Sequence, residues 1–100
     1  MCKGDKQYFG LTVKGSSMYP KYMDGDIIIV LSQNDCESGD DCVVSIGNDD
    51  ATLKKVIKLN DAIMLQPINA EYTPIMYTNK EIKYLPIKIL GVVKELRRKI

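Results

Sequence analysis

The chain contains no histidine in its 100 residues. Without imidazole, the Ser-His-Asp arrangement that activates a serine nucleophile is excluded. A zinc site is improbable as well, because three cysteines are too few sulfur ligands to hold the metal alone. A catalytic serine here needs another nitrogen base to take its proton, and lysine is the side chain that remains.

The cysteines are few and odd in number, and they form no C-x-x-C motif. Cys36 and Cys42 flank an acidic loop that contains glycine, so a bond between them stays open, and Cys2 lies at the start of the chain. We expect all three to be free thiols in a reducing cytoplasm, where disulfides are rare.

Long apolar runs are absent too. The longest, from Ile27 to Leu31, is far shorter than the roughly 18 residues of a membrane span, and the first six residues lack the apolar segment of a secretory signal. The formal net charge is only +1, and we interpret the basic cluster Arg97-Arg98-Lys99 as a solvated end. We therefore expect a cytoplasmic protein that has no membrane partner and does not grip DNA by itself.

What the chain does contain is a series of short apolar runs separated by turn residues, which is typical of β-structure. The run 27–31 is apolar at every position, which indicates a strand buried on both faces. No stretch keeps the roughly 3.6-residue helical period for three turns, although residues 95–100 fit a short helical end. We predict one all-β domain without repeats or linkers, with strands at residues 8–14, 27–31, 42–46, 51–59, 62–66 and 85–94.

Ser17 lies in a segment with strong turn signals. Gly15 allows a sharp turn before it, Pro20 restricts the backbone after it, and we interpret the aspartates of Asp24-Gly25-Asp26 as turn formers. Neighbouring amides in such a loop could form an oxyanion hole. Taken alone, however, the short motif fits a pair of turn serines better than an active site.

A lysine base would come from Lys54 or Lys55, 37 and 38 residues after Ser17. Strand alternation puts the two lysines on opposite faces, each with apolar neighbours, so periodicity does not choose between them. A catalytic lysine must be buried, because burial lowers its pKa and leaves the amine uncharged. Lys54 and Lys55 also fit two charged, solvent-facing side chains on an exposed edge strand.

Gly15-Ser16-Ser17-Met18-Tyr19-Pro20, followed by Asp24 to Val30, resembles the nucleophile segment of the self-cleaving LexA and phage CI repressor family. Three further blocks follow in family order: the lysine-bearing strand at 51–56, an L-x-P-x-N-x-x-Y/F-x-P-I passage at 65–75, and a closing strand at 89–93. The resemblance spans about residues 9 to 94. Four collinear blocks are far more specific than one motif.

The resemblance implies a compact, highly curved all-β catalytic domain that pairs with itself and needs no cofactor. It implies Ser17 as nucleophile and Lys54 as base, because the family's base follows a Thr-x pair, with Lys55 as an exposed neighbour. Thr52 would orient the amine of Lys54, and Met18 would contribute to the oxyanion site. By the same resemblance, Asn69 and Pro74 shape a loop near the cleft.

The partners that the resemblance implies are a second copy of the chain and a RecA filament that stimulates self-cleavage. Operator DNA would be bound only by a separate domain on the N-terminal side, with residues 1–100 forming the C-terminal domain. The residues given contain no Ala-Gly or Cys-Gly bond, which family members normally cut, and no helix-turn-helix. We expect either a C-terminal fragment or a member that no longer cuts itself.

Three other functions stay open. The chain could be a non-catalytic dimerisation module that pairs through the strand at Leu85 to Val93, or a processed accessory subunit of a translesion DNA polymerase. Bacterial signal peptidase shares an S-M-x-P motif and a K-[RK]-V strand, which Lys54-Lys55-Val56 fits. That family also needs a membrane anchor, of which the sequence shows no sign.

Overall fold

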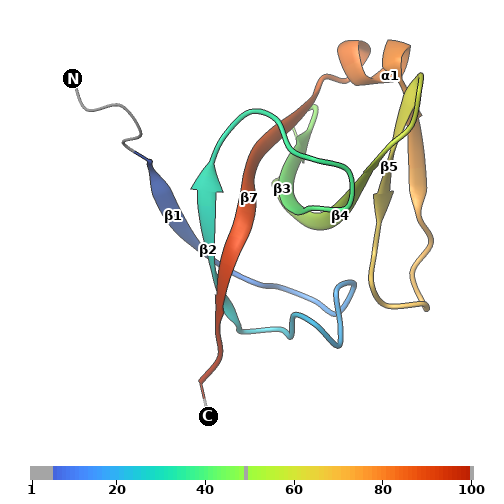
Figure 1. Cartoon of the computed structure of the whole chain (residues 1–100). Helices are drawn as coiled ribbons and strands as arrows, with labels where there is room; N and C mark the ends of the chain where they lie inside the picture. The colour runs from blue at the N-terminus through green and yellow to red at the C-terminus, as the bar shows by residue number, and fades with distance from the viewer. Residues whose placement is uncertain (1–5, 49, 100) are drawn as a thin grey trace.

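The computed structural model describes residues 6–48 and 50–99, which form one antiparallel sheet and one short helix (Figure 1). Within these residues the strand order is β1-β2-β7-β3-β4-β5-β6. The predicted all-β class is therefore confirmed. The elements are β1 (Tyr8–Thr12), β2 (Ile27–Ser32), β3 (Asp41–Ile46), β4 (Thr52–Lys58), β5 (Ala62–Gln66), β6 (Ile75–Thr78), α1 (Asn79–Tyr84) and β7 (Ile87–Arg97).

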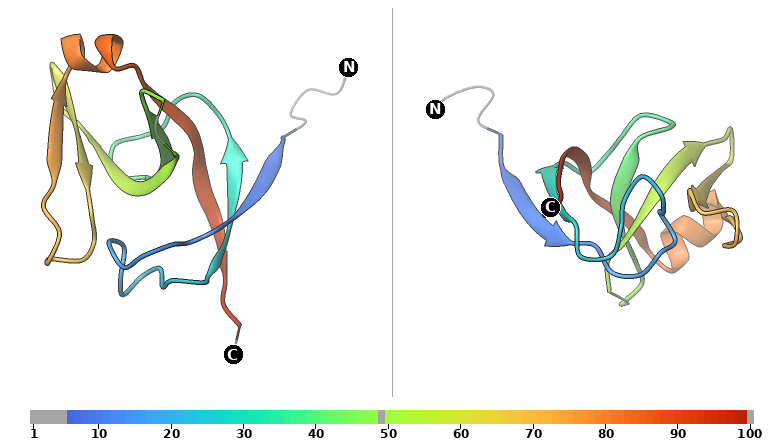
Figure 2. Two further views of the ribbon diagram at one scale, coloured as in Figure 1. Left: turned by 180° about the vertical axis from the view of Figure 1, so that it is seen from behind. Right: turned by 90° about the horizontal axis from the view of Figure 1, so that it is seen from below.

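The sheet is strongly curved, so that β1 and β5 lie at opposite sides of a bent layer (Figure 2). Two irregularities in β7 contribute to the bend. The register of β7 skips Leu90 where it pairs with β3 and Lys94 where it pairs with β2. Each extra residue is a bulge, which bends the strand and increases its twist.

Two hydrophobic clusters fill the two sides of β3. Cys42 and Val44 belong to the first cluster, whereas Val43, between them, belongs to the second. This division follows from the alternation of side chains along a strand. β3 is therefore buried on both faces and contributes to both halves of the core.

The sequence prediction missed β6 and α1. The strand begins directly after Pro74 at the edge of the sheet, where its outer N–H groups need no partner. The helix is short, but its start is well defined: Thr78 and Glu81 form a reciprocal capping box. That T-x-x-E spacing was present in the sequence as a helix signal.

The predicted helical end at residues 95–100 is wrong. β7 continues to Arg97, because Glu95 to Arg97 pair with Ile27 to Ile29 of β2. Arg98 is exposed, as expected for a solvated end, but its guanidinium also forms two charge-assisted hydrogen bonds of 2.9 and 2.8 Å with the buried carboxylate of Asp26.

The double-sided burial predicted for residues 27–31 is only partly correct. Ile28 and Val30 are buried, but the side chain of Ile27 is 39% exposed. The reason is that the second cluster packs against one face of β2 alone.

The sulfur atoms of Cys36 and Cys42 are free and buried, in agreement with the expectation of thiols, and Cys2 lies outside the described residues. Burial raises the pKa of both thiols. Among the described residues, α1 is the only helix, and it is too short to cross a bilayer.

Gly91 of β7 lies so close to β2 that a side chain at this position has no room. A Cβ atom there would lie 2.5 Å from the Leu31 carbonyl oxygen, whereas one on Gly10 would meet nothing closer than 3.9 Å. We predict that Gly91→Ala lowers the free energy of unfolding by about 1–3 kcal/mol, because the strands must separate.

Urea unfolding measures this prediction, with Gly10→Ala as the matched control. The control is expected to change the free energy of unfolding by less than about 1 kcal/mol. Equal effects of the two substitutions would contradict the packing argument.

Candidate active site: a serine and a lysine at the foot of the sheet

The loop that carries Ser17 is closed by hydrogen bonds between its ends. The Val13 amide donates to the Asp26 carbonyl at 2.8 Å, and the Gly25 amide donates to the Val13 carbonyl at 2.8 Å. Gly15 turns the chain at a φ of +82°, and its amide donates to the Asp24 carboxylate at 2.7 Å. Asp24 therefore works as a turn residue, and Ser17 sits on a loop with little freedom.

A second segment holds the loop from the side. The Asn69 backbone N–H donates to the Ser17 carbonyl at 2.9 Å, and its side-chain amide donates to the Ser16 carbonyl at 2.9 Å. The hydroxyls of Ser16 and Tyr72 lie 3.0 Å apart. Residues 69–72 belong to the connection between β5 and β6, which lies beside the blue loop in Figure 1. Pro74 is exposed and directly precedes β6.

The side chains of Ser17, on this loop, and Lys54, on β4, are in contact. The amine nitrogen of Lys54 lies 3.1 Å from the Ser17 hydroxyl oxygen, 2.9 Å from the Thr52 hydroxyl oxygen and 3.2 Å from the Leu53 carbonyl oxygen. A neutral amine has two N–H donors and one lone pair. If the two donors serve Thr52 and Leu53, the lone pair faces the Ser17 hydroxyl, which is the geometry of a general base.

The electrostatics favour the same assignment. Burial lowers the pKa of Lys54, because the charged ammonium loses its hydration. The burial of Lys54 was expected from the sequence, but the contact of its amine with the Leu53 carbonyl was not. A backbone acceptor carries no side-chain signal, so the sequence could not have revealed it.

Lys55 points away from the serine. Its amine lies 3.0 Å from the Asp41 carboxylate and donates to the Gly39 carbonyl at 3.1 Å. The expectation of an exposed neighbour is wrong, since the side chain is only 29% exposed and is ion-paired. Side chains alternate along β4, so Lys55 leaves the face opposite to Lys54, where it meets the buried carboxylate of Asp41.

The side chain and the backbone of Met18 make different contacts. Its side chain is 2% exposed and packs in the second cluster, while its carbonyl accepts a hydrogen bond of 2.9 Å from the Tyr22 amide. Among the described residues, neither the N–H of Ser17 nor that of Met18 donates to a backbone acceptor outside the strands and the helix.

Two hollows flank the serine and the lysine. One, of about 430 Å³, is lined by Ser17, Met18 and Leu53, among others. The other, of about 300 Å³, is lined by Lys54 and by the apolar side chains of Ile46, Leu65 and Ile75. Asp50 and Thr52 border both hollows. The first hollow therefore borders Ser17, and the second borders Lys54. The described residues contain no cluster of three or more acidic or cysteine side chains that could hold a metal ion.

A family model described as Peptidase S24-like matches residues 1–94. The chain belongs to that family. It is 42% identical over 94 residues to a LexA repressor from Caldicellulosiruptor saccharolyticus, covering 93% of this chain and 45% of the relative. It is 38% identical over 98 residues to a LexA repressor from Pelotomaculum thermopropionicum, covering 97% and 44%.

A LexA repressor from Geobacillus kaustophilus is 36% identical over 95 residues, covering 94% of this chain and 44% of the relative. The chain thus spans a little under half the length of these curated relatives. The resemblance to the LexA and CI family that the sequence motifs indicated is confirmed.

We predict that Lys54→Met raises the free energy of unfolding at neutral pH, because it removes an amine whose charged form is disfavoured by burial. The pKa of Lys54 is lower in the folded chain than in the unfolded chain. Between the two pKa values the unfolded state binds more protons, so wild-type stability rises with pH relative to the variant. The variant's advantage should shrink as the pH rises toward the unfolded value of about 10.4.

Urea unfolding of both proteins at a series of pH values between neutral and alkaline checks this behaviour. An advantage of the variant that stays constant or grows over this range would show that Lys54 is not desolvated in the folded state.

Proposed function

We propose that this chain is the catalytic and dimerisation domain of a LexA/CI-like transcriptional repressor, and that it cleaves a peptide bond with a Ser17-Lys54 dyad. The observation that carries the proposal is the distance of 3.1 Å between the Ser17 hydroxyl and an amine whose pKa burial lowers. Serine is a weak nucleophile without such a base.

In the proposed reaction, the lone pair of Lys54 takes the Ser17 hydroxyl proton while the oxygen attacks the scissile carbonyl carbon. The amides of Ser17 and Met18 stabilise the resulting oxyanion. Lys54 then gives its proton to the leaving amine as the C–N bond breaks, which leaves an acyl ester on Ser17. Water hydrolyses the ester, with Lys54 again as the base.

Thr52 is proposed as an orienting residue. Its hydroxyl, at 2.9 Å from the amine, keeps one N–H of Lys54 occupied so that the lone pair remains directed at Ser17. The Leu53 carbonyl, at 3.2 Å, occupies the other N–H. Thr52 and Lys54 are two positions apart on β4, so their side chains leave the same face of the strand.

The regulatory part of the proposal rests on the relatives, which are named LexA repressors and are about twice as long as this chain. We propose that residues 1–100 follow an operator-binding domain, pair with a second copy, and respond to a RecA filament. Pairing places two weakly binding DNA-binding domains together, so that the second binds the operator at a high effective concentration and the dimer binds more tightly than either domain alone. Cleavage between the operator-binding domain and the dimerisation domain would remove that gain in affinity.

The test supplies the chain with a peptide containing an Ala-Gly bond, and separately with a serine-directed fluorophosphonate probe, at alkaline pH. Wild type is expected to cut the peptide and to be labelled at Ser17. Ser17→Ala and Lys54→Met are expected to lose at least about 1,000-fold in rate, as nucleophile and base act as a unit.

Matched controls separate the dyad from its neighbours. Ser16→Ala removes the adjacent exposed hydroxyl, and Lys58→Met removes an exposed amine from the same strand; both are expected to retain cleavage and labelling. Cleavage that persists in Ser17→Ala or Lys54→Met would contradict the dyad. Absence of labelling in wild type would favour a dimerisation module without catalysis.

A further inference from the structure

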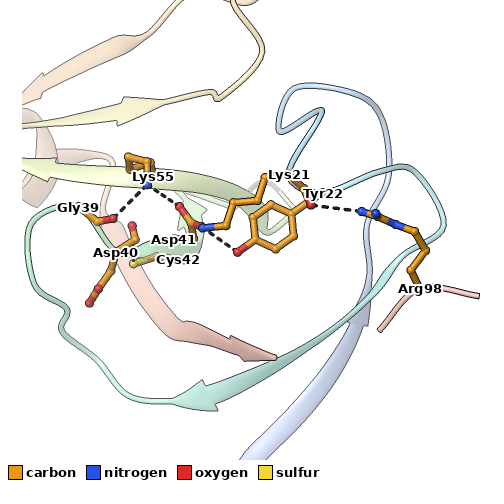
Figure 3. A network of polar contacts seen from close by, with 8 residues as sticks. All are labelled: Lys21, Tyr22, Gly39, Asp40, Asp41, Cys42, Lys55 and Arg98. Carbon is orange, nitrogen blue, oxygen red and sulfur yellow. Dashed lines mark hydrogen bonds and ion pairs between the residues drawn. The ribbon is translucent and has the colours of Figure 1, made fainter. Parts of the chain in front are cut away.

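Asp41, at the start of β3, is a buried carboxylate that the proposed reaction does not use. Its side chain is 4% exposed, yet three groups donate to it (Figure 3). One carboxylate oxygen accepts from the Lys21 amine at 2.6 Å and the Tyr22 hydroxyl at 2.8 Å; the other accepts from the Lys55 amine at 3.0 Å. The carboxylate thus joins the loop that carries Ser17 to β3 and β4.

This site is ionised and fully paired. Burial alone would raise the pKa of the Asp41 carboxyl, but hydrogen bonds from Lys21, Tyr22 and Lys55 more than offset it, and the net pKa lies below the usual value. Within the described residues, no buried side-chain nitrogen or oxygen lacks a hydrogen-bond partner. Removing one partner from a buried ion pair is costly, because the remaining charges stay desolvated.

The contacts of Asp41 lead directly to the catalytic loop. Tyr22 is held at its hydroxyl by Asp41, and its amide donates to the Met18 carbonyl at 2.9 Å, one residue after Ser17. The ring of Tyr22 and the side chain of Met18 pack in the same cluster. The loop is therefore attached to β3 through a polar contact and an apolar one.

The second carboxylate oxygen of Asp41 contacts β4 through Lys55. Lys55 pairs with Asp41 across the strands, and it is the residue next to Lys54. Side chains alternate along a strand, so Asp41 and Lys55 act on one face of β4 while Lys54 leaves the opposite face. One carboxylate thus fixes both the backbone that bears the nucleophile and the backbone that bears the base.

We propose that Asp41 is a positioning residue for the Ser17-Lys54 pair, which holds the loop of residues 14–25 against β4 and so keeps water away from the Lys54 amine. The inference rests on the proposed function. The inference goes beyond the proposed function because it assigns a role to a buried charge on the face of the sheet opposite to Lys54.

The physical consequence concerns both distance and hydration. Loss of the carboxylate frees Lys21 and Tyr22 and leaves Lys55 without its charge partner. The loop can then move away from β4, which lengthens the contact between the Ser17 hydroxyl and the Lys54 amine and admits water to that amine. Hydration removes the cause of the lowered pKa, so the pKa of Lys54 should rise toward its ordinary value.

The experiment compares wild type, Asp41→Asn and Val92→Ala. Asp41→Asn keeps the shape of the side chain and removes its charge. Val92→Ala opens a cavity in the first cluster and destabilises the fold. Neither Val92 nor its strand partners Leu31 and Cys42 line the two hollows.

Two readouts are taken below the melting temperature of each protein. The first is the rate of fluorophosphonate labelling at Ser17 as a function of pH. The second is the NMR titration of the Lys54 side-chain carbon next to the amine, which does not depend on activity. Asp50 borders both hollows and Lys14 lines the first. Tyr72 contacts the Ser16 hydroxyl, and Asp24 accepts from the Gly15 amide. These four titratable groups are present in every variant.

For Asp41→Asn we expect labelling at neutral pH to fall at least about tenfold, because small displacements of reacting groups are costly. We also expect the midpoints of the labelling profile and of the Lys54 titration to move to higher pH. Val92→Ala should melt earlier but keep both midpoints of wild type. If Asp41→Asn does not fold, Tyr22→Phe removes only one hydroxyl and should move the midpoints in the same direction, by less.

The two proposals fail in different ways. A wild-type chain that is not labelled at Ser17, or a Lys54→Met variant labelled as fast as wild type, overturns the proposed function. Midpoints that are unchanged in Asp41→Asn, or in Tyr22→Phe where the former does not fold, overturn the positioning role. Midpoints that move equally in Val92→Ala overturn it as well, since a general loss of stability would then explain them.

Discussion

The site depends on burying a lysine amine beside a serine hydroxyl. Water favours the ammonium form strongly, so the amine of Lys54 becomes a base only where hydration is restricted. Its half-buried position on β4 supplies that restriction, and the Thr52 hydroxyl and Leu53 carbonyl supply acceptors for the two N–H groups of the neutral amine. In the proposed dyad, a lysine in this setting takes the part that imidazole has in the Ser-His-Asp arrangement.

The rest of the fold can be understood as support for that contact. Hydrogen bonds between Val13 and the Gly25-Asp26 turn close the serine loop, and Asn69 holds it from the side. Bulges in β7 bend the sheet, and β3 is buried between two clusters beneath the dyad. Each contact restricts one of the two groups of the proposed dyad. In the proposed reaction, the entropy of bringing these groups together is therefore lost on folding.

The sequence predicted the parts that are local. The all-β class, the main strands and the free thiols followed from short apolar runs and from the number and spacing of the cysteines. The distinction between Lys54 and Lys55 did not follow from periodicity, because both faces of β4 carry apolar neighbours; it required the resemblance to the LexA and CI family.

Long-range contacts explain what the sequence could not give. Asp41 stands in a run of polar residues that indicates only a loop, and its three donors come from a distant loop and a neighbouring strand. The extension of β7 to Arg97 depends on pairing with β2, and the buried partner of Arg98 lies 72 residues away. The capping box of α1, by contrast, was a local signal that the periodicity argument passed over.

The most direct measurement of the central claim is a crystal structure of the chain after reaction with a peptide-like fluorophosphonate. The account predicts a covalent bond from phosphorus to the Ser17 oxygen, with the Lys54 amine within about 3.2 Å of that oxygen. It also predicts a phosphoryl oxygen at about 2.7–3.1 Å from the Ser17 and Met18 amides. An adduct on another residue, or a Lys54 amine turned to solvent beside a modified Ser17, would contradict it.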